Sequence, residues 1–417
     1  MEQVEKHTGY RWLVLLAGCM AICSIYVDMI AYAPILGEVA GKLNIELGAA
    51  TNLMMGFVLS VACVLIWGGV VCDKFGITVA MVLGLLCSTV PTALIPLIGG
   101  NFTAVMLARL VQGASVGFVF ATIGPILALW FPPKEHGMAS GLLIGSISLG
   151  CALGVFASPA ILAMTGGWEK TVFILGTPGW VAILLVMLIT RKSPPALGTQ
   201  EAQSSTAPPR DEMSFVGALA CPITWLGSLI VFCNAWAMYC LYNLVPPYLA
   251  ANPPMGLGLG AAMSGKLSIA VTIIGLFATI FGGIFFDKVA KGNSRVAAII
   301  GFLISACVIV ILLPMVSQSI GVLALCLLIS GWGIPFMGPS LSAFIAMNYP
   351  PSIVGRMIGW WFGFGTFGGA AGLYLGGMSI SRSGNFYLAI GMISIASIVG
   401  VLLSLFLKNN RKLPVAC

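Results

Sequence analysis

Long uninterrupted apolar runs fill most of the chain and are separated by short polar segments. Crossing a hydrocarbon layer about 30 Å thick takes roughly 20 apolar residues in a helix. Runs of this kind lie near residues 12–36, 50–71, 77–98, 102–130, 138–164, 170–190, 222–247, 260–285, 295–314, 320–348, 357–379 and 386–407. Apolar and polar residues do not alternate in them, as they would in the strands of a membrane barrel. The pattern predicts an all-α membrane protein with twelve transmembrane helices.

Composition strengthens this prediction. Of the 417 residues, 59% are hydrophobic and only 7% are charged, whereas an ordinary soluble domain has about 25% charged residues. So few charges argue against soluble domains, disorder and nucleic-acid binding. The chain also lacks a nucleotide-binding loop, a metal-ligand cluster and a nucleophile–histidine pair, and its histidines are only His7 and His136. We therefore expect no enzyme activity, no cofactor and no metal.

The basic residues outside the apolar runs are distributed unequally between the two sides of the membrane. One side receives 14 of the 19 Lys and Arg residues, whereas the other receives only Lys42, Lys170 and Arg382. Cytoplasmic loops carry the excess of Lys and Arg in membrane proteins. The distribution predicts that both termini are cytoplasmic, in a multi-pass protein of the cytoplasmic membrane.

The chain contains an internal repeat. The segment Gly69-Val-Val-Cys-Asp-Lys74 recurs as Gly283-Ile-Phe-Phe-Asp-Lys288, 214 positions later. Gly124-Pro125 recurs as Gly338-Pro339 at the same offset. Self-similarity at a fixed offset indicates a duplicated structural unit. The predicted domains are an N-terminal six-helix half, a polar cytoplasmic linker and a C-terminal six-helix half, at residues 1–190, 191–213 and 214–417.

Two motifs and this layout carry a resemblance to a known family. Gly69-x-x-x-Asp73-Lys74-x-Gly76 follows the second apolar run, and Arg109-x-x-Gln112-Gly113 lies in the fourth. They resemble the signature loop and the span-4 arginine motif of the major facilitator superfamily, whose transporters have two halves related by a parallel repeat. The resemblance covers the whole chain. In layout it is most similar to the monocarboxylate and oxalate/formate branches, which transport organic anions.

The resemblance implies a secondary transporter that works by alternating access, with spans 1, 4, 7 and 10 lining the central path and span 8 beside it. It also implies that Asp73, Lys74, Asp287 and Lys288 lie at cytoplasmic helix ends and act in gating, by latching the outward-open state. The alternative is that these loops are solvated turns whose charges only set the topology.

Three charged residues fall inside apolar runs, where a charge is costly and by default indicates function. Asp28 either forms a structural ion pair with Arg109 or is a protonatable coupling group. Arg109 is either a packing anchor for backbone carbonyls of span 4, or it binds an anion or orients Asp28. Lys266 either extends to the membrane interface or faces the path.

The sum of these charges suggests the substrate. One Asp against one Arg and one Lys leaves one positive charge unpaired, and a buried unpaired cation is expensive unless a ligand neutralises it. We therefore expect a small organic anion, most simply a carboxylate, that bridges Arg109 and Lys266. Transport would be proton-coupled (symport) or by exchange (antiport), in a monomer within the lipid bilayer.

Polar and aromatic residues extend the candidate substrate site. Spacing of i, i+3 and i+7 places Trp236, Tyr239 and Asn243 on one helical face. The candidate substrate-binding residues besides the two cations are Tyr32, Gln112, Trp236, Tyr239, Asn243 and Trp332. Plain packing is the alternative for Tyr239 and Trp332.

A second function also fits the span-1 acid and the span-4 arginine. A proton-driven exporter of cationic or lipophilic drugs would use Asp28 as its cation site. The Gly-Pro motif that drug/proton exchangers carry in span 5 is missing, because Val155 follows Gly154 and the next proline is Pro159. Its absence favours the anion carrier.

Overall fold

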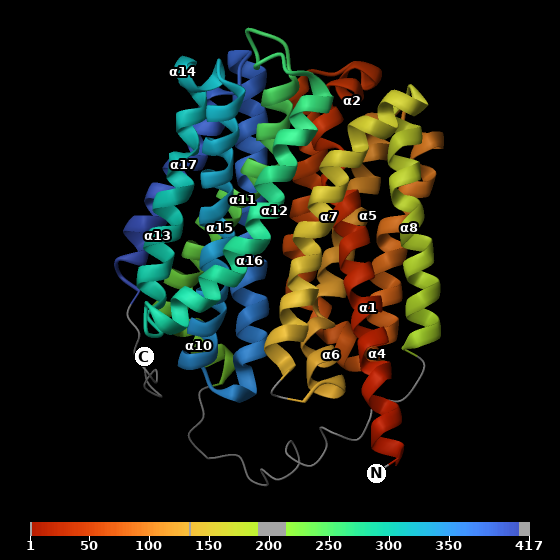
Figure 1. Cartoon of the computed structure of the whole chain (residues 1–417), viewed down its shortest axis with the longest axis vertical. Helices are drawn as coiled ribbons and strands as arrows, with labels where there is room; N and C mark the ends of the chain where they lie inside the picture. The colour runs from red at the N-terminus through yellow and green to blue at the C-terminus, as the bar shows by residue number, and fades with distance from the viewer. Residues whose placement is uncertain (1, 133–134, 191–213, 408–417) are drawn as a thin grey trace.

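A computed structural model describes residues 2–132, 135–190 and 214–407. In these ranges the protein is helical and contains no strand, so the predicted all-α fold is confirmed. Figure 1 shows the helices aligned along the long axis in two groups, the N-terminal helices in red to yellow-green on the right and the C-terminal helices in green to blue on the left. The predicted linker 191–213 lies outside the described residues.

The N-terminal group begins with a helix that continues through a short 3-10 turn into a surface helix. Its elements are α1 (Glu2–Ile30), η1 (Ala33–Ile35), α2 (Leu36–Leu43), α3 (Leu47–Ala50), α4 (Asn52–Ile98), α5 (Phe102–Phe120), α6 (Ile123–Trp130), α7 (His136–Thr165) and α8 (Trp168–Ile189). Two predicted spans lie within α4, and Gly76 separates them with a non-helical conformation (φ 84°, ψ 169°). Glycine adopts positive φ without the steric cost of a Cβ, which explains why the second motif glycine stands at this break.

The C-terminal group repeats the pattern of long helices. Its elements are α10 (Phe215–Ala220), α11 (Pro222–Ala250), α12 (Gly260–Lys288), α13 (Ser294–Ala306), η3 (Cys307–Leu312), α14 (Pro314–Ser317), α15 (Ile320–Asn348), α16 (Pro351–Ser383) and α17 (Tyr387–Ser404). In both groups an asparagine side chain caps a helix start: Asn101 accepts from the Ala104 amide and Asn293 from the Arg295 amide. Such caps satisfy backbone donors that have no partner within the helix.

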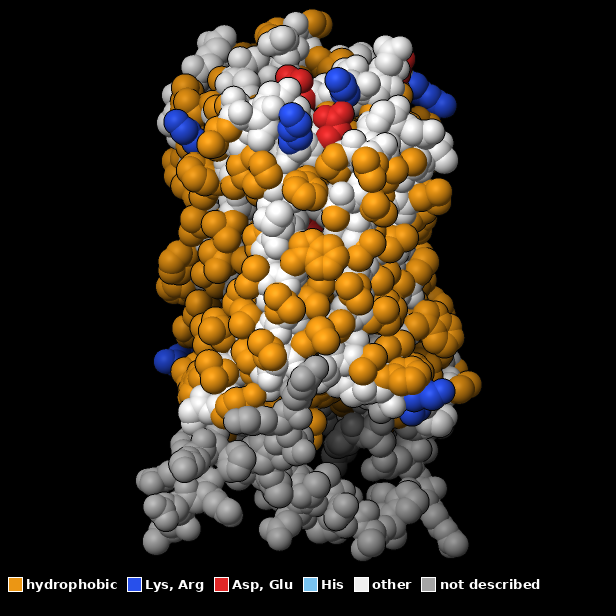
Figure 2. All heavy atoms as spheres, turned by 90° about the vertical axis from the view of Figure 1, so that its right-hand side faces the viewer, with side chains coloured by type: hydrophobic (Ala, Val, Ile, Leu, Met, Phe, Trp, Pro, Cys, Tyr) orange, Lys and Arg blue, Asp and Glu red, His pale blue; other side chains and the backbone are white. Residues whose placement is uncertain are grey.

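Among the described residues, eleven helical segments are long and apolar enough to cross a membrane. The expected span at 357–379 is not one of them, although it lies within the 33-residue helix α16. Figure 2 shows a broad band of apolar side chains across the face turned to the viewer, with Lys, Arg, Asp and Glu gathered toward the two ends of that face. This distribution is that of a multi-pass membrane protein, and the count of twelve spans stays a prediction.

The two groups approach most closely at the end where α2 and α14 lie, here called the outer end; the opposite end, with α6 and α10, is the inner end (Figure 1). A Cβ on Gly377 of α16 would lie 1.9 Å from Thr51 Oγ1 and 2.6 Å from the Gly48 carbonyl oxygen. A Cβ on Gly265 of α12 would lie 2.7 Å from the carbonyl oxygen of Val155 in α7. Glycine is therefore required where the groups meet at this end, because any side chain would force the backbones apart.

Candidate functional site

Arg109 of α5 is completely buried, and its guanidinium joins three helices. Its Nε donates to the carbonyl oxygen of Leu53 at 3.1 Å. Nη1 donates to the carbonyl oxygen of Asp28 at 3.2 Å, and Nη2 donates to that of Met29 at 3.0 Å. The side chain thus anchors backbone carbonyls of α1 and α4, the first two predicted spans, and not those of span 4 that the anchor hypothesis named. Anion binding by Arg109 stays a prediction.

Two aromatic rings enclose the same guanidinium. Its Cζ lies 4.4 Å from the ring centre of Tyr32 and 4.5 Å from that of Phe57. Aromatic faces attract a cation electrostatically, more strongly when the pair is desolvated. The Tyr32 ring also packs on the ring of Trp168, with ring centres 5.9 Å apart. Tyr32 therefore belongs to the Arg109 cluster.

Asp28 is also buried, and it connects to Arg109 through intermediate side chains. Ser88 and Thr92 donate to Asp28 Oδ2 at 2.5 and 3.5 Å. Gln112 Nε2 donates to Thr92 Oγ1 at 2.7 Å, and Gln112 Oε1 accepts from Arg109 Nη1 at 3.0 Å. Asp28 Oδ1 has no hydrogen-bond partner among the described residues. One carboxylate oxygen is thus held in the network while the other is unoccupied.

A direct ion pair between Asp28 and Arg109, one alternative from the sequence, does not form in this conformation. The one ion pair among the side chains that the structure describes joins Arg11 and Glu135 at 3.0 Å. Ser88 and Thr92 were not singled out from the sequence. Their spacing of four within an apolar run was the available signal, since it places two hydroxyls on one helix face.

Lys266 of α12 is exposed, whereas Arg109 is buried. It follows the same helical stripe as Ile273, Phe277, Ile280 and Ile284, which are 45–52% exposed. Its neighbour Gly265 faces α7 instead. The exposed Lys266 is thus not part of the buried Arg109 cluster in this conformation, and the anion bridge expected between them stays a prediction. The stripe of exposed apolar residues has the composition of a surface that faces lipid.

The α11 candidates pack mainly against α16. A Cβ on Gly369 would lie 2.2 Å from the Tyr239 ring, and one on Gly372 would lie 3.0 Å from the Trp236 ring. Asn243 is 1% exposed and its Nδ2 donates to the carbonyl oxygen of Tyr239 at 2.8 Å. In this conformation the three residues fill a helix–helix interface, and their substrate contacts stay a prediction.

Trp332 of α15 lies in a separate apolar cluster. Its ring centre is 5.5 Å from that of Phe281 in α12. The cluster is built on buried Ala278, Ala297 and Phe336, which lie on α12, α13 and α15. The packing alternative for Trp332 accounts for this position.

The candidate gating residues lie just before the break at Gly76 within α4 and at the last residues of α12. Lys74, Asp287 and Lys288 are exposed, whereas the side chain of Asp73 is outside the described part of the structure. The Lys74 ammonium lies 5.4 Å from the ring centre of Phe75. Their gating role stays a prediction.

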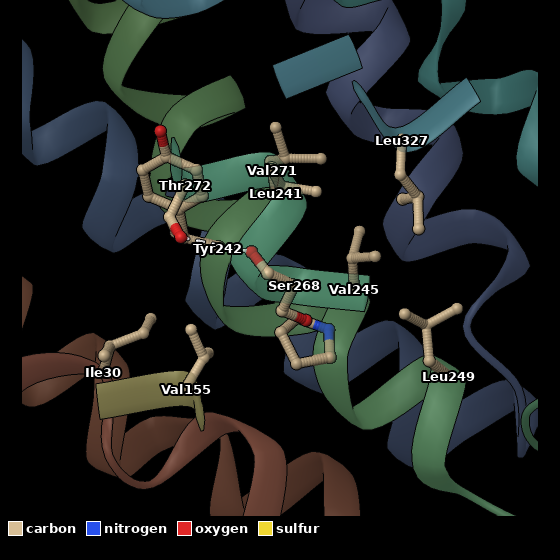
Figure 3. A pocket seen from close by; sticks show the side chains of 11 residues that line it. Ile30, Val155, Leu241, Tyr242, Val245, Leu249, Ser268, Val271, Thr272 and Leu327 are labelled. Atoms are coloured by element: carbon tan, nitrogen blue, oxygen red, sulfur yellow. Dashed lines mark hydrogen bonds between the residues drawn. The ribbon is translucent and has the colours of Figure 1, made fainter. Parts of the chain in front are cut away.

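A small pocket lies where the two groups of helices meet. Figure 3 shows Ile30 of α1 and Val155 of α7 on one side of it, across from side chains of α11 and α12 and from Leu327 of α15. Most of its lining is apolar, and its polar side chains are Tyr242, Ser268 and Thr272. Ser268 is 6% exposed, and its hydroxyl has no hydrogen-bond partner among the described residues.

The chain is similar to a known family and to proteins named as transporters. A family model described as Major Facilitator Superfamily matches residues 14–318 and 227–416. "Probable sulfoacetate transporter SauU" of Cupriavidus necator is 27% identical over 429 residues, covering 97% of this chain and 95% of that protein. "Probable anion transporter 5" of Arabidopsis thaliana is 24% identical over 398 residues, covering 89% and 88%. "Ascorbate transporter, chloroplastic" of the same plant is 22% identical over 308 residues, covering 70% and 56%.

Proposed function

Because the chain belongs to the Major Facilitator Superfamily, a family of transporters and not of enzymes, we propose that it carries a small organic anion across the cytoplasmic membrane by alternating access, together with a proton. The observation that carries the proposal is similarity along nearly the whole chain to proteins named as anion transporters. Sulfoacetate, named for one of these relatives, has a carboxylate and a sulfonate and is the first substrate to test.

The buried charges support coupling to protons. Arg109 and Asp28 are the only charged side chains that are buried in the described part of the chain, and their charges sum to zero. An anion that enters this low-dielectric region adds a negative charge, which is costly without compensation. A proton on Asp28 restores neutrality and leaves Arg109 to face the anion. Each anion would therefore travel with at least one proton.

Arg109 and Asp28 each keep one hydrogen-bonding group without a partner, which this step can use. An arginine has five N–H donors, and four of those on Arg109 are accounted for by Leu53, Asp28, Met29 and Gln112. One N–H on Nη2 stays available for an anion, and Asp28 Oδ1 stays available for a proton. Lys266 has no part in this scheme; we assign its ammonium to the lipid headgroup region.

The proposal is tested by uptake of labelled sulfoacetate into proteoliposomes that contain the purified protein. An inward proton gradient should raise the initial rate, and a protonophore should remove the increase. Asp28→Asn should lose the response to the gradient but retain exchange of labelled for unlabelled anion, because its neutral side chain mimics the protonated state. Lys266→Ala, a change on the lipid-facing stripe, is the matched control and should behave like the natural protein.

Two results would contradict the proposal. A protein that accumulates none of a panel of carboxylates and sulfonates, but expels lipophilic cations against a proton gradient, would be a drug exporter. Gradient-driven uptake that persists in Asp28→Asn would make Asp28 a structural residue.

A further inference from the structure

Ser268 differs from the other polar residues of its helix. The hydroxyl of Ser264, one turn earlier, donates to the Pro246 carbonyl oxygen at 2.6 Å. Thr272, one turn later, donates to the Ile269 carbonyl oxygen at 3.0 Å. The Ser268 hydroxyl has no partner among the described residues, although the residue is only 6% exposed. A buried donor without an acceptor costs free energy, so the unpaired hydroxyl points to a ligand.

The residues around Ser268 indicate the chemical class of such a ligand. The walls of the pocket are apolar (Figure 3). They are formed by Val271 and Leu327 and, across the interface between the two groups of helices, by Ile30 and Val155. Apolar walls favour a carbon skeleton and disfavour a fully hydrated inorganic anion. Besides the hydroxyls of Tyr242 and Thr272, the pocket offers the unpaired hydroxyl of Ser268, which can donate one hydrogen bond to an oxygen atom.

The pocket and the charged cluster lie on different sides of α1. Ile30 lines the pocket and is two residues after Asp28, and side chains two positions apart on a helix do not face the same way. The pocket can therefore contact only a part of the substrate that Arg109 does not hold. In this conformation the pocket has a free volume of about 10 Å³, which is about the space of one water molecule. It admits a substrate only when the two groups of helices move apart.

We propose that Ser268 and the pocket around it form a specificity subsite for the transported anion, an inference that rests on the proposed function. The subsite selects short organic anions that carry a second oxygen-bearing group: the apolar walls contact the carbon atoms, and the Ser268 hydroxyl donates to that second group. Acids without the second group bind more weakly, because the hydroxyl stays unpaired.

The test compares how unlabelled acetate, glycolate and inorganic sulfate inhibit uptake of labelled sulfoacetate. Glycolate has the size of acetate plus one hydroxyl, so the difference between their inhibition constants isolates the second group. In the natural protein glycolate should inhibit more strongly than acetate, and sulfate least. Ser268→Ala should reduce the glycolate–acetate difference by about 2- to 10-fold, the range for one hydrogen bond. It should also raise KM for sulfoacetate and leave the maximal rate nearly unchanged.

Two further variants make the result specific to the hydroxyl. Ser264→Ala removes a hydroxyl of the same helix that is already bonded to Pro246, so its glycolate–acetate difference should match that of the natural protein. Ser268→Thr keeps a hydroxyl and should retain most of the difference. Thermal unfolding in detergent checks that each variant is folded. The subsite is supported if Ser268→Ala loses the difference between the glycolate and acetate inhibition constants while Ser268→Thr retains it.

The outcomes separate this inference from the proposed function. If the natural protein takes up sulfoacetate but Ser268→Ala leaves the glycolate–acetate difference intact, Ser268 binds only water and the subsite is wrong. Inhibition by sulfate as strong as that by glycolate would overturn it as well. If the natural protein transports no anion at all, the proposed function itself fails.

Discussion

A guanidinium can remain deep in a membrane protein only when its donors and its charge are compensated locally. For Arg109 the compensation comes from three backbone carbonyls, the Gln112 side chain and two aromatic rings. The planar fork of arginine reaches several acceptors in fixed directions, whereas lysine presents a single ammonium. The residue type is thus set by geometry as well as by charge.

Arg109→Lys should therefore destabilise the protein while keeping the positive charge. The shorter list of donors leaves buried carbonyl oxygens of α1 and α4 unsatisfied, and hydrogen bonds to charged groups contribute about 1.5–3 kcal/mol each. We expect a clear fall in the thermal unfolding temperature in detergent and a loss of uptake. Arg382→Lys, at an exposed position, should change neither. An unfolding temperature equal to that of the natural protein would show that the carbonyl contacts contribute little.

At this scale the sequence identified Asp28 and Arg109 correctly as buried charges, because a charge within a long apolar run is conspicuous. It did not reveal that Thr92 and Gln112 connect them. Hydrogen bonds between different helices depend on how the helices are rotated and how deep each lies, and neither quantity is encoded in one segment.

Between helices, close contact of backbones determines whether the outer or the inner end of the molecule is closed in this structure. At the outer end α16 lies against α3 and the start of α4, through Gly377 and Gly48. Nearer the inner end of the same helix pair, a Cβ on Gly363 would lie 2.6 Å from the Ile66 side chain and 3.5 Å from the nearest backbone atom, the Ile66 nitrogen. Flexible side chains can move aside, whereas backbone cannot. The outer contact is therefore the one that a small side chain would break.

Gly377→Ala should favour conformations that are open at the outer end. Its Cβ would lie 1.9 Å from Thr51 Oγ1 and 2.6 Å from the Gly48 carbonyl oxygen, and the clash is relieved only if α16 and α3 separate. A cysteine placed at Leu327 in the pocket should then react several-fold faster with a membrane-impermeant maleimide added outside. Gly391→Ala, where a Cβ meets nothing within 4 Å, is the control. Equal labelling rates in the two variants would exclude a gate at Gly377.

For the whole molecule, the distribution of charge sets the orientation in the membrane. The excess of Lys and Arg on one side predicts that the inner end faces the cytoplasm. A cysteine at Lys42, near the outer end of the N-terminal group, should react with an impermeant maleimide in intact cells. A cysteine at Lys288, at the inner end of α12, should react only after the cells are permeabilised. The opposite pattern would reverse the orientation, and with it the assignment of outer and inner ends.

The sequence by itself determined the membrane location, the helical fold and the family, since hydrophobicity along a segment and short motifs are local properties. Tertiary structure decided which side of each helix faces protein. On α12, Leu267 and Val271 are buried while Ile273 and Phe277 are exposed, and all four are apolar because both lipid and the protein interior are apolar. Periodicity therefore could not tell that Lys266 is exposed while Ser268, two residues later, lines the pocket. Because lipid is as apolar as the protein core, only the packing of the helices distinguishes the exposed side of a helix from its buried side.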